Sequence, residues 1–202
     1  LGPIIRKWRG MKPIAANSLY ETLIIYLVLQ NATVRRSVQM LENLFRKFGK
    51  KVKFDNKVLS TFWGPKDMAK STEEELRELK VGYRAKSFMK MTKQFADGII
   101  DEFALRKASR EKIREGVRRL YGIGPASTEY LLFEDFYFLG ILERVPSWEQ
   151  KIMSKLLFNK ELVPADQILD FFKTRYKGYE KLAFHYVWED LFWRWQNEPV
   201  EW

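Results

Sequence analysis

The sequence of 202 residues contains no cysteine and only one histidine, His185. The lack of cysteine excludes disulfides, thiol nucleophiles, zinc–thiolate sites and cysteine-bound iron–sulfur clusters. One histidine cannot make a histidine-rich metal site, so we expect no metal and no other cofactor. The apolar runs are too short for a bilayer span and no signal peptide is visible, which favours a cytoplasmic or nucleoid protein without membrane contact. The chain begins at Leu1 instead of an initiator methionine, which leaves its natural start open.

Acidic residues are fewer than basic ones, with 26 Asp and Glu against 36 Lys and Arg. The net charge of +10 and the isoelectric point near 9.6 indicate a polyanionic partner, and nucleic acid fits this charge better than a membrane does. The basic residues are spread along the chain and do not form a tail. A soluble domain that is merely basic is the plainer alternative.

Neither strand-like alternation nor internal repeats are visible, whereas apolar residues recur at helical spacing through most of the chain. The sequence therefore predicts an all-α protein, with an irregular basic arm over residues 1–17 and a loop over 50–65. Glu74 and Gln150 are placed to complete capping boxes at two helix starts. The predicted helices begin at the polar caps Ser18, Thr33, Ser71, Ser109 and Ser147 or at the prolines Pro125 and Pro164.

The most informative stretch is Leu120-Tyr121-Gly122-Ile123-Gly124-Pro125-Ala126-Ser127. Gly122 and Gly124 permit a tight turn with positive φ and a close backbone approach, and Pro125 suits the first position of a new helix. Free backbone N–H groups at a helix start bind phosphate. An ordinary turn between two helices is the alternative. Three basic side chains on the preceding turns favour an anion: Arg114, Arg118 and Arg119.

This turn resembles the helix-hairpin-helix motif of the base-excision DNA glycosylases. Leu29-Gln30-Asn31-Ala32-Thr33-Val34 is similar to the Leu-x-Gln-Gln-Thr-type turn of that superfamily. Leu76-Arg77-Glu78-Leu79-Lys80-Val81-Gly82-Tyr83-Arg84-Ala85-Lys86 is close to the 8-oxoguanine glycosylase form of its Leu-Arg-x-Leu segment. Each motif is moderately specific alone, but they occur in the family's order and cover about residues 17–195.

The resemblance implies a two-lobed helical bundle, with lobes at about 19–110 and 111–202 and the arm 1–17 as a candidate part of the second lobe. Members of the family flip a damaged base out of the duplex, receive it between the lobes and cleave its N-glycosidic bond. The implied partner is double-stranded DNA containing a damaged base or an abasic site, bound by a monomer. The segment around Gly82-Tyr83-Arg84 favours an oxidised purine, while alkylated purines, hypoxanthine, uracil and abasic sites stay open.

The same resemblance implies which residues contact DNA. Backbone N–H groups of the hairpin would hold phosphates, and Asn31 or Gln30 would fill the gap left by the flipped base, with Tyr83 opposite. The alternatives are a helix C-cap for Asn31 and a rim aromatic packed between helices for Tyr83. The DNA-binding candidates are Gln30, Asn31, Tyr83, Arg84, Gly122, Gly124, Ala126 and Ser127.

The sequence departs from the family at the catalytic carboxylate. Where the family has an aspartate at a Val-Asp-x-x-type helix start, this chain has Val145-Pro146-Ser147-Trp148-Glu149-Gln150-Lys151-Ile152. The hypothesis is that Glu149 replaces the aspartate, and the alternative is an acid that only complements the helix dipole. Glu134 and Asp135 are reserve candidates.

A second departure concerns the lysine that forms a Schiff base in bifunctional members. Ala126 occupies its position, so a monofunctional enzyme is the simplest expectation. Lys151 is a candidate displaced nucleophile, and a phosphate-binding or solvated lysine is the plainer interpretation.

The base pocket is expected to use aromatic and polar side chains. Tyr130 and Trp148 lie near the hairpin and the catalytic helix in sequence, and Lys181 and His185 fall where the 8-oxoguanine enzymes grip the base. The alternative is that the aromatic residues here belong to the core and that His185 is structural.

The favoured function is a base-excision repair DNA glycosylase, with AP-lyase activity left open. The main alternative is a catalytically inactive DNA-damage-binding protein of the same fold, because the family's aspartate is missing. An unrelated helical protein that binds another protein is the third.

Overall fold

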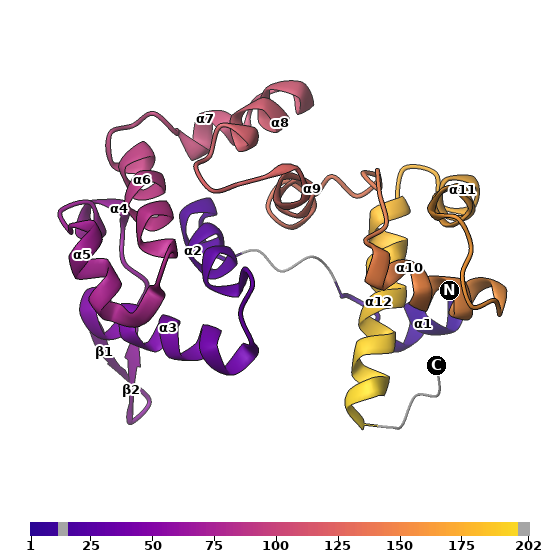
Figure 1. Ribbon diagram of the computed structural model, residues 1–202, viewed down its shortest axis with the longest axis horizontal. Coiled ribbons are helices and arrows are strands. Elements are labelled where there is room, and N and C mark those ends of the chain that lie inside the picture. Colours follow the sequence, from indigo (N-terminus) through magenta and orange to yellow (C-terminus); the bar gives the residue numbers. More distant parts are fainter. Residues whose placement is uncertain (12–15, 198–202) are drawn as a thin grey trace. The chain divides into compact units, whose positions relative to one another are not determined.

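The computed structural model describes residues 1–11 and 16–197, without the side chains of Ala126, Trp148 and residues 195–197. The described chain is mainly helical, which confirms the predicted fold class, and it contains one two-stranded sheet (Figure 1). It divides into two compact units, which we call the middle unit (Ala15–Thr128) and the terminal unit (Leu1–Ile14 with Glu129–Trp202). These bounds differ from the lobes expected from the sequence. None of the described helices is both long and apolar enough to cross a membrane.

The middle unit is organised around α2, which packs against α3 and α6 (Figure 1). Because α2 is apolar on nearly all sides, Leu23, Ile24 and Leu27 are completely buried. The predicted caps of α2 and α3 are confirmed, since Ser18 and Thr33 accept hydrogen bonds from the backbone N–H groups of Glu21 and Arg36. The elements of this unit are α2 (Leu19–Leu29), α3 (Val34–Phe48), β1 (Lys51–Phe54), β2 (Lys57–Ser60), α4 (Pro65–Met68), α5 (Glu73–Leu76), the π-helical turn η1 (Arg77–Val81), α6 (Arg84–Ala96), α7 (Glu102–Arg106), α8 (Arg110–Arg118) and the start of α9 (Pro125–Glu134).

The terminal unit is organised around its last helix, α12. A core that includes Met153, Phe172 and Phe184 joins α10, α11 and α12. The N-terminal helix α1 also packs on α12, where Lys7 Nζ and Trp8 Nε1 each donate to Asp190 Oδ1 at 2.9 Å. The elements of this unit are α1 (Gly2–Lys7), the rest of α9, α10 (Ser147–Phe158), α11 (Ala165–Arg175) and α12 (Glu180–Asn197).

Three local expectations were wrong. The basic arm contains helix α1, with a proline in its first turn where the missing N–H costs nothing. The loop expected over 50–65 contains the β1–β2 hairpin, whose turn residues Asp55 and Asn56 both have positive φ, as a tight antiparallel hairpin requires. The first capping box lies one residue later than expected, between Thr72 and Glu75.

The expected capping box at α10 was also wrong. Pro146 is the N-cap of this helix, and it makes no side-chain cap hydrogen bond. The Gln150 side chain instead donates to the carbonyl of Val163 at 2.8 Å and so ties α10 to the segment that precedes α11.

Candidate nucleic-acid interface and lysine cluster

The turn between α8 and α9 in the middle unit uses its two glycines differently. Gly122 has φ of +82°, and a Cβ there would lie 3.3 Å from Ser87 Oγ, so the fold itself requires glycine. Gly124 does not have positive φ, and a Cβ there would meet no described atom within 4 Å. Neither backbone strain nor internal packing therefore explains Gly124, whose backbone is open to an approaching partner.

The start of α9 has backbone N–H groups that find no acceptor within the helix. Pro125 has no N–H, and the first helical hydrogen bond is donated by Thr128 to the carbonyl of Gly124 at 2.9 Å. By helix geometry, the N–H groups of Ala126 and Ser127 precede that bond and lack an acceptor within the helix. Such a helix start carries partial positive charge and suits a phosphate. The Ser127 side chain is buried, and its Oγ lies 2.6 Å from the hydroxyl of Tyr26.

Two glutamine side chains hold this turn in place. Gln94 of α6 accepts a hydrogen bond from the N–H of Tyr121 and donates one to the carbonyl of Arg119, both at 2.9 Å. Gln30, at the end of α2, donates to the carbonyl of Gly122 at 3.4 Å. The turn is therefore fixed before any ligand binds, which reduces the entropy cost of binding.

The predicted wedge residues lie beside this turn. Gln30 contacts Gly122 directly, and Asn31 is exposed with φ of +47°, the left-handed conformation expected of a residue that follows a helix C-terminus. Tyr83 is 57% exposed. Arg84 is 6% exposed, and its guanidinium donates to the carbonyls of Leu27 and Gln30. It therefore supports the end of α2 from inside the protein and does not present its charge to solvent.

In the terminal unit, Glu149 and Lys151 lie on different sides of α10. Glu149 is partly buried and shares a helix face with the fully buried Met153, four residues later. Lys151, two residues after Glu149, is exposed on another face. Burial raises the pKa of the Glu149 carboxyl above its ordinary value, and the positive charge of Lys181 opposes that rise.

Lys181 and His185 share one face of α12 and both lie close to Phe133 of α9. Lys181 Nζ is 5.9 Å from the Phe133 ring centre, and the His185 ring packs edge-on to Phe133 at 5.1 Å. Burial lowers the pKa of Lys181, against the charges of Glu149 and two other carboxylates. Burial and the charge of Lys181 lower the pKa of His185 to about 4, so its imidazole is neutral at pH 7.

Glu149, Lys181, His185 and Phe133 therefore form one group of neighbours, which we call the lysine cluster. The sequence identified all of them except Phe133, which sits four residues after Glu129 on the same face of α9. Of the other predicted pocket residues, Tyr130 is 41% exposed on α9, while the side chain of Trp148 lies outside the described residues. The reserve carboxylates Glu134 and Asp135 are both buried and engaged with neighbours.

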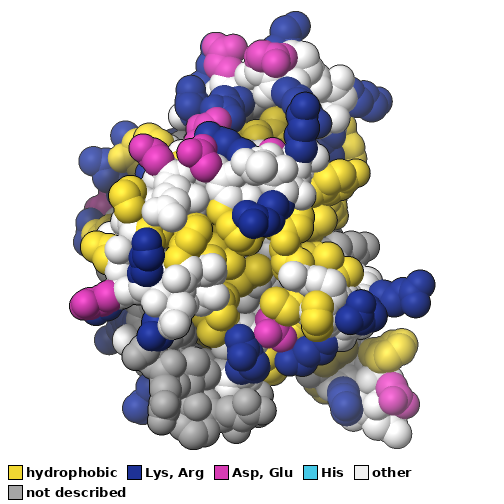
Figure 2. Space-filling view, turned by 90° about the vertical axis from the view of Figure 1, so that its right-hand side faces the viewer, with side chains coloured by type: hydrophobic (Ala, Val, Ile, Leu, Met, Phe, Trp, Pro, Cys, Tyr) yellow, Lys and Arg dark blue, Asp and Glu magenta, His cyan; other side chains and the backbone are white. Residues whose placement is uncertain are grey.

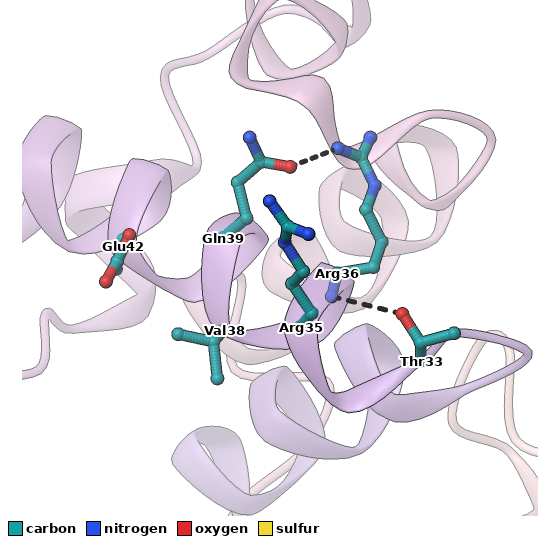
Figure 3. A pocket seen from close by; sticks show the side chains of 6 residues that line it. All are labelled: Thr33, Arg35, Arg36, Val38, Gln39 and Glu42. Atoms are coloured by element: carbon teal, nitrogen blue, oxygen red, sulfur yellow. Dashed lines mark hydrogen bonds between the residues drawn. The ribbon is translucent and has the colours of Figure 1, made fainter.

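A separate hollow of about 520 Å³ lies along α3 (Figure 3). Its basic side chains are Arg35 and Arg36, and Arg36 is already engaged because it donates to Gln39 Oε1 at 2.7 Å and to the carbonyl of Lys80. It contains none of the predicted site residues. No group of three or more metal-ligating side chains occurs among the described residues.

The family described as HhH-GPD superfamily base excision DNA repair protein matches residues 24–164. A comparison with curated proteins gave no match.

Solved structures of DNA glycosylases have the same fold. The 8-oxoguanine glycosylase/lyase of Clostridium acetobutylicum matches 93% of this chain with a TM-score of 0.74 and 19% identity. The 3-methyladenine DNA glycosylase of Archaeoglobus fulgidus matches 95% with a TM-score of 0.74 and 17% identity. Mag1, the 3-methyladenine DNA glycosylase of Schizosaccharomyces pombe solved with abasic DNA, matches 93% with a TM-score of 0.66 and 16% identity.

This chain covers 65% of the Clostridium enzyme, 66% of the Archaeoglobus enzyme and 89% of Mag1, so it spans just under two thirds of the first two. Because the family match extends over more than half of the sequence, the chain belongs to the HhH-GPD superfamily of base excision DNA repair proteins.

Proposed function

We propose that this protein is a DNA glycosylase that binds damaged double-stranded DNA as a monomer and hydrolyses the N-glycosidic bond of the damaged base. The observation that carries the proposal is the glycine turn before α9, where Gly124 is open to a partner and adjacent N–H groups lack acceptors within the helix. These donors suit a DNA phosphate. Membership of a base excision repair family supports the same partner and a place of action where the DNA lies, in the cytoplasm or nucleoid.

The end of α2 would act on the base stack. Gln30 and Asn31 lie at the helix end next to the turn, so a phosphate held by the turn would bring the duplex to them. Insertion of either side chain would fill the space of a flipped base, and the exposed ring of Tyr83 would press on the neighbouring bases. Arg84 contributes by fixing the carbonyl of Gln30.

Glu149 is the proposed catalytic carboxylate. In its ionised form it would stabilise the positive charge that develops on the deoxyribose and orient the attacking water. Burial raises its pKa, which makes it a better proton acceptor, and the positive charge of Lys181 favours the ionised form. Phe133, Lys181 and His185 lie around it as candidate contacts for the base.

The test is the release of free base from duplexes that carry oxidised purines, alkylated purines, hypoxanthine or uracil. We expect release from at least one lesion, and we expect Glu149→Gln to lower its rate by about 100-fold or more while DNA binding persists. Glu161→Gln is the matched control, since it removes an exposed acid in the same unit.

The base-release assay also distinguishes a glycosylase from the alternative function. The missing aspartate and the alanine at position 126 favour, as a second candidate, a protein that binds damage without excising it. Tight binding to damaged DNA without base release from any duplex would support that alternative. Release by Glu149→Gln at the wild-type rate would remove Glu149 from the mechanism.

A further inference from the structure

Bifunctional members of the family form a Schiff base through a lysine at the start of the helix that corresponds to α9. This chain has Ala126 at that position, so any such reaction would need an amine from elsewhere in the protein. Lys151 is exposed and lies on a different face of α10 from Glu149. Lys181 is partly buried within the lysine cluster. We propose that the amine of Lys181 is the nucleophile that forms a covalent imine with C1′ of the deoxyribose, which gives the protein AP-lyase activity. This inference rests on the proposed DNA glycosylase function and adds a covalent step to it.

The surroundings of Lys181 are those of a reactive amine. Its Nζ lies 5.2 Å from the ring centre of Phe184 and 5.9 Å from that of Phe133, and both rings are almost completely buried. Removing water from an ammonium group favours its neutral form, and only the neutral amine carries the lone pair that attacks carbon. Burial accordingly lowers the pKa of Lys181.

The titratable groups around Lys181 come from α9, α10, α12 and the segment before α10. The carboxylates of Glu149 on α10 and of Glu129 and Glu134 on α9 favour the ammonium form, whereas Arg144 opposes it. Arg144 Nε lies 3.4 Å from Glu129 Oε1 and so offsets part of that carboxylate's charge. On α12 itself, His185 is neutral at pH 7 and adds no charge there.

The reaction at an abasic site needs no added oxidant or cofactor. The Lys181 lone pair attacks C1′ of the aldehyde, and loss of water leaves a protonated imine. A base removes a proton from C2′, the electron pair moves toward the imine, and the C3′–O bond breaks with the 3′ phosphate as the leaving group. Glu149 is placed to accept and return these protons, and hydrolysis of the imine frees Lys181.

The experiment is borohydride trapping of the full chain on a duplex with a single abasic site, which reduces the imine to a stable adduct. We expect the wild-type protein to form an adduct at Lys181, located by mass spectrometry of the digested complex. Lys181→Arg keeps the charge and much of the volume, and we expect it to reduce trapping by about 100-fold or more. Lys173→Arg, on the surface of α11, is the matched control and should trap like wild type.

The pH dependence of trapping provides a second readout that a merely structural lysine would not change. With a lowered pKa, the trapping rate should level off at a pH below the ordinary lysine value of 10.5. An adduct mapped to Lys151 or to any other residue, unchanged trapping by Lys181→Arg, or no adduct with wild type would each overturn the proposal. Base release and DNA binding, measured on the same samples, report separately on the glycosylase function, so its failure is distinguishable from the failure of Lys181.

Discussion

His185 shows how the surroundings of a side chain determine its pKa and charge. It is the only histidine in the chain, and it packs against the Phe133 ring close to the positive charge of Lys181. Its side chain is 18% exposed, and one of its ring nitrogens lies 3.9 Å from Glu189. A neutral histidine in this place can offer a hydrogen bond without adding a second positive charge beside Lys181.

This environment predicts a stability change at acid pH. The pKa of His185 is about 4 in the folded protein and near 6.5 when unfolded, so the unfolded chain binds the extra proton between these values. The free energy of unfolding should therefore fall as the pH drops from 6.5 to 4, by at most about 3 kcal/mol from this group. Urea unfolding across this pH range, compared between wild type and His185→Phe, measures the difference.

The comparison with the variant is needed because other groups titrate nearby. Burial raises the pKa values of Glu149 and Glu189, and raised acid pKa values change stability with pH in the opposite direction. These groups are present in both proteins and cancel to first order. An unfolding free energy whose difference between wild type and variant does not vary with pH would contradict a neutral His185.

At the scale of elements, the two glycines of the turn between α8 and α9 have different surroundings. Gly122 is required by its own backbone and by its contact with Ser87, whereas Gly124 has open space where a Cβ would stand. Gln94 and Gln30 fix the turn from α6 and α2, so its donors keep their positions when the ligand is absent. The proposed contact with a DNA phosphate is therefore at Gly124 and the N–H groups after it, and not at Gly122.

Two alanine variants test this division. Gly124→Ala should leave the free energy of unfolding unchanged or slightly higher, while weakening DNA binding by roughly fivefold because the methyl group blocks the approaching phosphate. Gly122→Ala should lower the free energy of unfolding by about 1–2 kcal/mol because alanine is strained at positive φ. Thermal unfolding and fluorescence anisotropy with a labelled duplex measure both quantities. Wild-type DNA affinity in Gly124→Ala would refute contact at this turn.

The helix starts show where local sequence signals were sufficient to predict secondary structure. Ser18, Thr33 and Ser109 cap their helices as expected, because a cap hydrogen bond joins residues only three positions apart. The β1–β2 hairpin was missed because each strand is only four residues long and almost wholly exposed, so the alternation of polar and apolar residues in Lys51–Phe54 is too short to indicate a strand. Its Asp55-Asn56 turn was the available signal, since both residue types tolerate positive φ.

For the whole molecule, the dominant property is its positive charge of +10. Figure 2 shows Lys and Arg side chains spread over the face that it presents, with apolar side chains between them. Such a distribution would attract DNA without regard to sequence or damage, and neutralising the phosphates would release counterions from the DNA.

Binding should therefore depend strongly on salt. We expect the logarithm of the DNA association constant to fall with the logarithm of salt concentration with a slope of about −3 or steeper, which corresponds to three or more neutralised phosphates. Anisotropy titrations between low and physiological salt measure the slope. Lys181→Arg conserves charge and should not alter it. Binding that does not change with salt would contradict a phosphate-based interface.

The sequence by itself determined the helical class, most helix starts, the glycine turn and membership of the DNA repair family. Hydrophobic periodicity, helix caps and turn residues involve only a few neighbouring positions, so the elements that they mark can be predicted without a structure. Only the tertiary structure decided that Arg84 supports the end of α2 from inside, that Glu149 is partly buried while Lys151 is exposed, and that Phe133 completes a cluster around Lys181. These facts depend on how helices distant in sequence pack, because packing sets the burial and the neighbouring charges that give each side chain its chemistry.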